Sequence, residues 1–490
     1  MQPVDVVNQL GAWSVGKGPL QQKLARALTQ AIRAGGIQAG IRLPSERVLA
    51  QALSLSRTTV VGAYDTLRVG GWLESRSGSG TWVSAGSPVV TAARDAAHAG
   101  ALAASPLFGL LSNRDGGDLL DFALGSPLPL AGLPADFFRL PDDEYSACTG
   151  DRLYYPLGLP PLRQSLAAYY TAMGVPTRPE HILVTNGAQQ GIALSAALYL
   201  QRGDTALVED PTYFGALDVF RALGARLSGL PVEATGVSPA VLRDRISATA
   251  ARLVYTTPTY QNPTGAVMPR TARKEIARIV AELGVPFIDD GTLAELVLDG
   301  APPPPIAACD PEAPIITIGS LSKLLWPGLR IGWVRAPEAI IGRLARVKSA
   351  TDLASPLLTQ AIAVRLLGSL QTARELRRQE LRPRRELLAA LLAEHLPTWI
   401  FRRPTGSLFL WTRLPSGDAR EFAQTCLRHG IVVLPGPIMS ASDRYANYLR
   451  LPFLAEPETL RLGVRRLAAA WQDYQSSLGE PAQAQSLTLV

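Results

Sequence analysis

From about residue 118 onward, short β-like runs alternate with amphipathic helices, and no other feature constrains the fold of this chain as strongly. The predicted strands are His181–Thr185, Thr205–Val208, Leu253–Thr256, Val285–Ile288, Ile315–Ile318 and Arg330–Val334. The predicted helices are 189–200, 214–224, 269–283 and 357–390. This alternation requires a parallel or mostly parallel sheet with helices on both faces. Strands expected at 407–413 and 431–434, mixed with helices, predict a smaller α+β subdomain near the end of the chain.

The N-terminal residues have a different pattern. Apolar residues at helical spacing predict helices over 19–35 and 45–53, and Ser56 is the expected N-cap of a third helix. Two β-like runs, 71–76 and 80–83, flank a Ser-Gly-Ser tip and predict a hairpin. Three helices followed by a hairpin is the order of a winged helix-turn-helix domain, whose third helix enters the DNA major groove.

The charge of this segment favours double-stranded DNA as its partner. Residues 1–83 carry nine Lys or Arg and four Asp or Glu, so nine minus four leaves +5 of the chain's formal +7. A small basic module of this kind suits a polyanion. The alternative is a winged helix that makes only protein contacts. The expected DNA-contacting residues are Arg47, Ser56, Arg57, Thr58, Thr59 and Arg76.

Between the two patterns, residues 84–117 are rich in Ala, Ser, Gly and Pro and predict a linker. Fully extended, such a linker reaches about 100 Å. We therefore expect a DNA-binding domain over 1–83 and an effector domain over 118–490. The large part of the effector domain would cover about 118–355, and the small part about 356–480.

Several classes of protein are disfavoured by the composition. The three cysteines are odd in number and widely spaced, which predicts a reducing compartment and no disulfide framework. The four histidines lie far apart, so no metal site is expected. No apolar run approaches the roughly 20 residues that span a bilayer, and no signal pattern is present. We expect a cytoplasmic protein without a membrane partner.

Lys323 is one of only five lysines among 48 basic residues. Arginine supplies the positive charge at nearly all other basic positions. Unlike arginine, a lysine can lose its proton and form an imine with a carbonyl cofactor. Lys323 follows a predicted strand and two serines and precedes Pro-Gly. Loops of this kind after strands are where α/β folds build their sites.

Polar segments follow four other predicted strands as well. They supply backbone donors for a phosphate after Thr185, an aromatic ring at Tyr213, an amide at Asn262 and carboxylates at Asp289 and Asp290. Ser320, Ser322 and Arg330 add hydroxyls and a cation near Lys323. Together with an amine, this set fits pyridoxal 5′-phosphate (PLP).

Both halves of the chain resemble known families. The stretch from Arg42-Leu-Pro-Ser-Glu-Arg through Leu-Ser-Arg-Thr-Thr-Val to Gly-Ser-Gly-Thr-Trp-Val resembles the GntR family of bacterial regulators. The strand-end segments, in their order and spacing, resemble fold-type I aminotransferases. Joined by a long linker, the two are similar to the MocR subfamily of transcription regulators. This resemblance implies a transcription regulator whose PLP-binding domain senses a small molecule. Our hypothesis is that a small amine or amino-acid-like effector acts through transaldimination at Lys323.

The resemblance also implies roles for single residues. Lys323 would form the imine, Asp290 would pair with the pyridine nitrogen, Asn262 would donate to the phenolic oxygen, and Tyr213 would stack on the ring. The cofactor phosphate would be held by Gly187, Ala188, Gln189, Ser320, Ser322 and Arg330. Arg450 matches the arginine that clamps a substrate carboxylate. Pro211 and Pro263 stand where the family has cis peptides.

The resemblance also implies that two copies of the chain associate. Family members form homodimers in which one chain's DNA-binding domain packs on the large domain of the other chain. Tyr154 or Tyr155 would reach the phosphate in the neighbouring subunit.

One departure from the aminotransferase pattern bears on function. The tyrosine expected shortly after Asp290 is replaced by Thr292 and Leu293, which argues against full catalytic competence. Three alternatives remain beside the effector-sensing regulator. The chain could be a working aminotransferase with a DNA-binding arm, a regulator that no longer holds PLP, or a sensor of free PLP.

Overall fold

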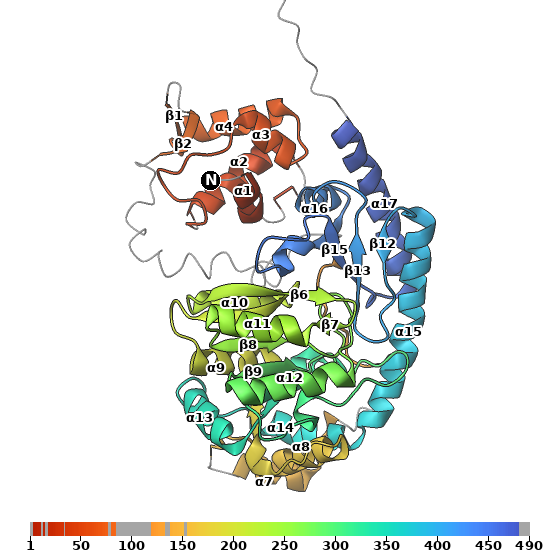
Figure 1. The fold of residues 1–490 in the computed structure, drawn as a ribbon. Coiled ribbons are helices and arrows are strands. Elements are labelled where there is room, and N and C mark those ends of the chain that lie inside the picture. Colours follow the sequence, from red (N-terminus) through yellow and green to blue (C-terminus); the bar gives the residue numbers. More distant parts are fainter. Residues whose placement is uncertain are drawn as a thin grey trace, which may run out of the picture.

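The structure, a computed structural model, describes residues 3–10, 13–14, 18–33, 35–76, 80–84, 119–132, 138–150 and 154–479. The described residues form three units: an N-terminal head, a large subdomain around an eight-stranded sheet, and a small subdomain around a five-stranded sheet (Figure 1). Apart from Ser84, the predicted linker lies outside the described residues. Among the helices that the structure describes, none combines the length and apolar character needed to cross a membrane.

The head has its own hydrophobic core, which includes Leu24, Leu28, Val60 and Tyr64. Its elements are α1 (Pro3–Leu10), α2 (Leu20–Arg33), α3 (Glu46–Ala52), α4 (Arg57–Val69), β1 (Leu73–Arg76) and β2 (Gly80–Val83). β1 and β2 pair antiparallel. The predicted three helices and hairpin are confirmed, whereas α1 was not predicted. The hairpin tip lies outside the described residues.

The large sheet is mostly parallel, as predicted. Its strands are β4 (Ile182–Thr185), β5 (Thr205–Asp210), β6 (Arg226–Glu233), β7 (Gly236–Val237), β8 (Leu253–Thr256), β9 (Phe287–Asp290), β10 (Ile315–Ser320) and β11 (Gly332–Arg335). In space they follow the order β4-β11-β10-β9-β8-β5-β6-β7. The run from β10 to β6 is parallel, and β11 is antiparallel to both of its neighbours.

Helices cover both faces of this sheet. One face is covered by α8 (Pro160–Ala172), α11 (Pro239–Thr249), α12 (Arg270–Leu283) and α14 (Leu357–Gly368), and the other by α9 (Ala188–Tyr199), α10 (Phe214–Ala222) and α13 (Glu338–Ser349). Neighbouring residues of a strand point to opposite faces. Phe287 accordingly packs into the first core and Ile288 into the second.

The small sheet takes one strand from the beginning of the effector domain. Its elements are β3 (Leu120–Phe122), β12 (Ile400–Phe401), β13 (Phe409–Arg413), β14 (Ile431–Pro435) and β15 (Tyr448–Pro452), with α15 (Leu370–His395), α16 (Ala419–Arg428) and α17 (Pro457–Gly479). The strand order is β12-β13-β15-β14-β3, and β3 runs parallel to β14. The sequence predicted β13 and β14 but not β3.

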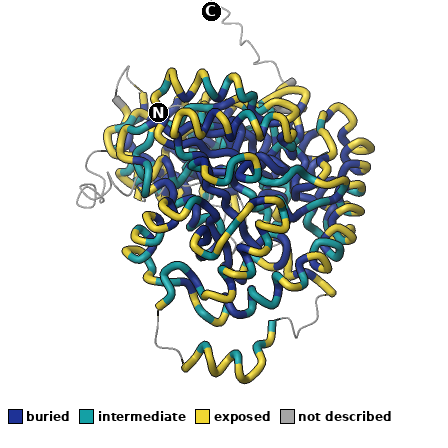
Figure 2. The backbone as a smooth tube through the Cα atoms, turned by 60° about the horizontal axis from the view of Figure 1, so that its bottom comes forward, coloured by how far each residue is buried: buried dark blue, intermediate teal, exposed yellow. Residues whose placement is uncertain are grey.

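Two further helical segments differ from the sequence-based expectation. The single helix expected over 357–390 is two helices, α14 and α15, that meet at Ser369. α7 (Asp142–Gly150) was not predicted and lies at the edge of the body without a buried residue (Figure 2).

Candidate functional site

A cavity of about 340 Å³ lies at the carboxyl ends of the parallel strands, where the large and small subdomains meet. Each loop that follows β4, β5, β8, β9 or β10 contributes side chains to it, as expected for an α/β sheet. Its lining includes Ala188, Gln189, Tyr213, Asn262, Asp290, Ser320, Ser322, Lys323, Arg330 and Arg450. These residues follow different strands in the sequence, and the structure brings them together in one cavity.

Lys323 lies in this cavity with its amine held by the backbone. Its Nζ donates a hydrogen bond to the Gly125 carbonyl over 2.7 Å. Burial, together with the nearby cations of Arg450 and Arg330, lowers the Lys323 pKa from 10.5 to about 8. Burial and like charge both disfavour the ammonium form. A larger share of the amine is therefore unprotonated near neutral pH and able to attack a carbonyl carbon.

Asp290 faces Lys323's cavity and is held by three donors. Its Oδ1 accepts from the Thr292 backbone N–H over 2.9 Å and from the Thr292 hydroxyl over 2.5 Å. Its Oδ2 accepts from the Tyr255 hydroxyl over 2.7 Å. The carboxylate is therefore fixed in position and suited to accept from a protonated ring nitrogen. Thr292, which replaces the expected tyrosine, thus supports Asp290.

The neighbouring carboxylate, Asp289, points to the opposite face of the sheet. It lines a separate cavity of about 610 Å³, together with Tyr170 and Trp333. Its Oδ2 accepts from the Ile306 N–H over 2.9 Å, and burial raises the Asp289 pKa. The alternation of side chains along β9 therefore separates the two acids, and of the two only Asp290 shares the cavity with Lys323.

The end of the cavity near α9 carries free backbone N–H groups and a cation, which suit an anion. The first N–H groups of a helix have no partner within the helix, and Ala188 and Gln189 occupy this position in α9. Arg330 donates from Nη2 to the Asn186 carbonyl over 2.7 Å. Gly187, the N-cap, has φ +81°, and a Cβ there would lie 2.8 Å from the Arg330 guanidinium. Glycine at this position therefore lets the cation approach the helix end.

Tyr213 and Asn262 also line the cavity. Tyr213 directly precedes α10 and lines the cavity, and burial followed by the Asp290 charge raises its pKa to about 12. Its ring is therefore neutral and available for stacking. Asn262 lies at a cis Asn262–Pro263 bond, and Asp210–Pro211 is also cis, so both predicted cis peptides are confirmed.

Arg450, from β15, closes the cavity from the side of the small subdomain. Only 2% of the residue is exposed. It donates to the Ala123 carbonyl over 2.6 Å and to Asn262 Oδ1 over 3.2 Å, and it lies 4.0 Å from the centre of the Phe409 ring. Burial lowers its pKa to about 9. A buried guanidinium of this kind favours an anionic partner that offsets its desolvation.

Sequence reasoning missed the segment that follows β3. Leu124, Gly125 and Ser126 line the cavity, and the carbonyls of Ala123 and Gly125 hold Arg450 and Lys323. The only signal was a short run, Leu119 to Leu124, that is apolar except for Asp121 and is followed by Gly-Ser.

Unpartnered polar atoms test whether this residue set fits PLP. In the part of the chain that the structure describes, Ser322 Oγ, Gln189 Oε1, Thr257 Oγ1 and Arg450 Nε are buried without a hydrogen-bond partner. Such atoms are rare in proteins and call for a partner. All four residues line the cavity, so a ligand with several polar groups fits there. No described group of His, Cys, Asp and Glu side chains is arranged to hold a metal.

The expected DNA-contacting residues lie on two helices and one strand of the head. Ser56 is the N-cap of α4, and its hydroxyl accepts from the Thr59 N–H over 3.2 Å. Arg57 and Thr58 begin α4 with exposed side chains, and Arg47 is exposed on α3. Arg76 ends β1, and its side chain lies outside the described part.

Tyr154, expected at the phosphate of a second subunit, is 72% exposed and does not line the cavity of its own chain.

Comparisons with known proteins identify both units. Residues 131–467 match the family described as aminotransferase class I and II, and residues 20–83 match the family of bacterial regulatory proteins, gntR family. The chain is 31% identical over 470 residues to the HTH-type transcriptional regulator YdfD of Bacillus subtilis, covering 92% of this chain and 96% of YdfD.

Two other relatives are informative. The probable rhizopine catabolism regulatory protein MocR of Rhizobium meliloti is 30% identical over 489 residues, covering 94% of this chain and 95% of MocR. The crystal structure of LysN, the α-aminoadipate aminotransferase of Thermus thermophilus, complexed with N-(5′-phosphopyridoxyl)-L-leucine, matches with a TM-score of 0.68 at 29% identity. That match covers 78% of this chain and 97% of LysN.

Proposed function

Because the chain belongs to the aminotransferase class I and II family and, by its gntR-type head, to the MocR-type regulators, we propose that it regulates transcription by sensing an amine through bound PLP. The DNA-binding head and the aminotransferase fold make it a DNA-binding regulator. The cofactor and the effector are the proposed parts. A bacterial regulator of this type acts in the cytoplasm, where its operator lies.

The observation that carries the proposal is the environment of Lys323. Its amine, with a pKa lowered to about 8, shares a cavity with a fixed carboxylate, Asp290, and an anion-binding helix end. Asp290 would hold the pyridine nitrogen, Asn262 the phenolic oxygen and Tyr213 the ring face. The phosphate would lie among Ala188, Gln189, Ser320, Ser322 and Arg330. When bound, the cofactor supplies a carbonyl carbon that condenses reversibly with primary amines.

The effector amine would replace the Lys323 amine, which returns to the cavity as a free Nζ. Arg450 would hold an acidic group of the effector, because this buried guanidinium faces the cavity with an unpartnered Nε. A carboxylate or a sulfonate would satisfy it. The effector is therefore a small amine that also carries an anionic group.

Regulation is favoured over turnover by what surrounds Asp290. The Thr292 hydroxyl donates its hydrogen bond to Asp290, and Leu293 is buried and apolar. Tyr213 is the one tyrosine among the described residues that line the cavity. The tyrosine hydroxyl that would assist proton movement at the phenolic oxygen is therefore missing from the lining.

A working aminotransferase is the second candidate, favoured by the presence of both Lys323 and Arg450 in the cavity. Incubation with amino acids and a keto acid separates the two. Multiple turnovers per protein chain support the enzyme. A regulator gives a change of cofactor absorbance without repeated product release, together with amine-dependent footprints on the DNA upstream of its gene. A purified protein that takes up no PLP would contradict both candidates.

A homodimer completes the proposal. Tyr154, exposed on its own chain, would reach the cofactor phosphate in a second copy of the chain. Sedimentation of the PLP-loaded protein tests the dimer, and the PLP affinity of Tyr154→Phe tests the residue.

A further inference from the structure

The second cavity, of about 610 Å³, lies on the face of the large sheet opposite to the cavity around Lys323. Its base is formed by strand residues: Asp289 of β9, Thr317 and Gly319 of β10, and Trp333 of β11. Its walls come from the end of α8, the beginning of α15 and the proline run 302–305. The proposed function uses none of these residues.

Asp289 places a buried carboxylate at the base of this cavity. The residue is 2% exposed, and its Oδ2 accepts from the Ile306 N–H. Burial raises the Asp289 pKa, and Arg273, the cation that lowers it, donates its hydrogen bonds to backbone carbonyls and to the Thr259 hydroxyl instead. A buried carboxylate without a hydrogen-bonded cation is unfavourable, and a cation inside the cavity would stabilise it.

Thr317 adds an unpartnered hydroxyl beside this carboxylate. The two residues are register partners in the parallel pair of β9 and β10, and both line the cavity. Thr317 is 3% exposed, and its Oγ1 is buried without a hydrogen-bond partner among the described residues. A hydroxyl oxygen accepts from an N–H donor, as a carboxylate does. A cation with more than one N–H would therefore serve both groups.

Three aromatic rings line the same cavity. Trp333 Nε1 donates to the Tyr170 hydroxyl over 2.9 Å, which fixes both rings. Tyr169 meets both edge-on, with ring centres 5.1 Å from Tyr170 and 6.1 Å from Trp333. A Cβ at Gly319 would lie 2.3 Å from the Trp333 ring, so glycine lets this ring approach β10. Aromatic rings attract cations and pack against planar apolar groups, so the cavity suits a cation with an aromatic body.

The other charges in the lining are already paired. Arg374 forms an ion pair with Glu295. Arg378 and Glu375 pair over 2.7 Å, and their side chains are 45% and 41% exposed, so this pair lies where solvent reaches the cavity. Of the charged residues that the structure describes in the lining, Asp289 is thus the one without an ion pair.

We propose that the second cavity is a binding site for a small organic cation that combines N–H donors with an aromatic body, such as an aryl amidinium or an aryl ammonium. Its N–H groups would donate to Asp289 and Thr317. Its ring would lie among Tyr169, Tyr170 and Trp333.

The cavity around Lys323 has the opposite charge. Lys323, Arg330 and Arg450 line it together with one acid, Asp290. It therefore favours anionic groups, whereas the second cavity favours a cation. Among the lining residues that the structure describes, the two cavities share only Ser320. The second site is therefore independent of the proposed function.

Calorimetric titration of the full-length protein with benzamidine tests the site. Benzamidine is a planar aromatic cation with several N–H donors, and its amidinium stays protonated and does not form an imine with PLP. It should bind with a Kd of about 1 mM or tighter. Benzamide, a neutral molecule of the same shape, should bind at least about tenfold more weakly, because it lacks the charge that Asp289 would pair with.

Two adjacent carboxylates give a matched pair of variants. Asp289→Asn keeps an oxygen for the Ile306 N–H and should weaken benzamidine binding at least about tenfold. Asp290→Asn makes the same change on the opposite face of the sheet and should keep the affinity within about twofold.

Thr317→Val tests the hydroxyl. Because Thr317 Oγ1 has no partner in the described part of the protein, this change breaks no internal hydrogen bond and should not lower the melting temperature. It should weaken benzamidine binding about threefold or more.

Four results would overturn the site. They are no binding of benzamidine to the wild-type protein, equal affinities for benzamidine and benzamide, an unchanged affinity in Asp289→Asn, and a loss in Asp290→Asn of the size expected for Asp289→Asn. The last result would place the ligand in the cavity around Lys323. If Asp289→Asn does not fold, Thr317→Val decides, and an unchanged affinity there refutes the proposal.

Discussion

The pH dependence of cofactor capture by the apoprotein follows from the environment of Lys323. With a pKa of about 8 rather than 10.5, roughly one amine in ten is unprotonated at about pH 7, instead of roughly one in three thousand. Since only the free amine attacks a carbonyl, the burial and the two arginines should accelerate imine formation near neutrality by about 300-fold over an ordinary lysine.

Stopped-flow absorbance of apoprotein mixed with PLP measures this rate. A group with a lowered pKa is protonated only below that pKa, so the rate should rise about tenfold per pH unit up to about pH 8 and then level off. N-acetyl-lysine methylamide, mixed with PLP under the same conditions, controls for the titration of PLP itself. Its rate should keep rising above pH 8.

The cause of the lowered Lys323 pKa can be tested as well as its value. Arg450→Met removes the cation that, after burial, lowers the Lys323 pKa most, so this pKa should rise and the levelling-off should move to higher pH. A wild-type rate that still increases tenfold per unit between about pH 9 and pH 10 would refute the reasoning. It would mean that Lys323 is as solvated as a free lysine.

Four further predictions concern single side chains. Lys323→Ala should abolish the imine absorbance and leave basal DNA binding intact, as measured by spectrum and gel shift. Thr292→Val removes one hydrogen bond to the Asp290 carboxylate and should weaken PLP binding by about 10-fold or more in an absorbance titration, whereas Thr292→Ser should not. Arg57→Ala should weaken operator binding and lower its salt slope by about one; an unchanged slope would remove Arg57 from the phosphate contacts. Arg450→Ala should keep bound PLP but blunt the spectral response to amino acids; equal responses to an amino acid and to its amine without the carboxylate are expected only in this variant.

Much of the cavity around Lys323 could be predicted because its parts are local. Each strand of a parallel sheet ends at the same edge, so a polar segment after a strand is placed by its position in the sequence. Lys323, Tyr213 and Asn262 were found in this way. Ser56 was found because a helix N-cap is a local signal, and its hydroxyl accepts from the Thr59 N–H as the pattern requires.

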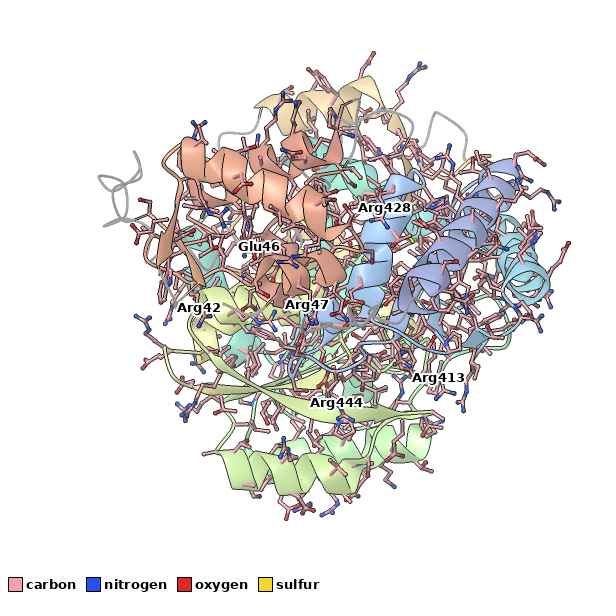
Figure 3. The ribbon with its side chains drawn as sticks, turned by 90° about the horizontal axis from the view of Figure 1, so that it is seen from above. Arg42, Glu46, Arg47, Arg413, Arg428 and Arg444 are labelled. Carbon is pink, nitrogen blue, oxygen red and sulfur yellow. The ribbon has the colours of Figure 1, made fainter. Side chains whose placement is uncertain are left out.

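The parts that could not be predicted depend on distant pairing. β3 has only three residues, and its partner β14 lies more than 300 residues later along the chain, so no local pattern marks Gly125 as the acceptor for Lys323. Tyr255 and Asp290 meet because β8 and β9 are neighbours in the sheet. The hydrogen bonds of Trp13 with Gln424 and of Arg428 (labelled in Figure 3) with the Leu53 carbonyl likewise join segments that are far apart in the sequence.

Asp289 and Asp290 show what the sequence determined and what only the tertiary structure decided. The sequence by itself determined that a strand ends in two carboxylates, and the period of two along a strand means that they point to opposite faces. It did not determine which face holds the cavity with Lys323. That was decided by the packing of α9 and α10 on one face and of α8 and α12 on the other, which places Asp290 with Lys323 and leaves Asp289 in the second cavity.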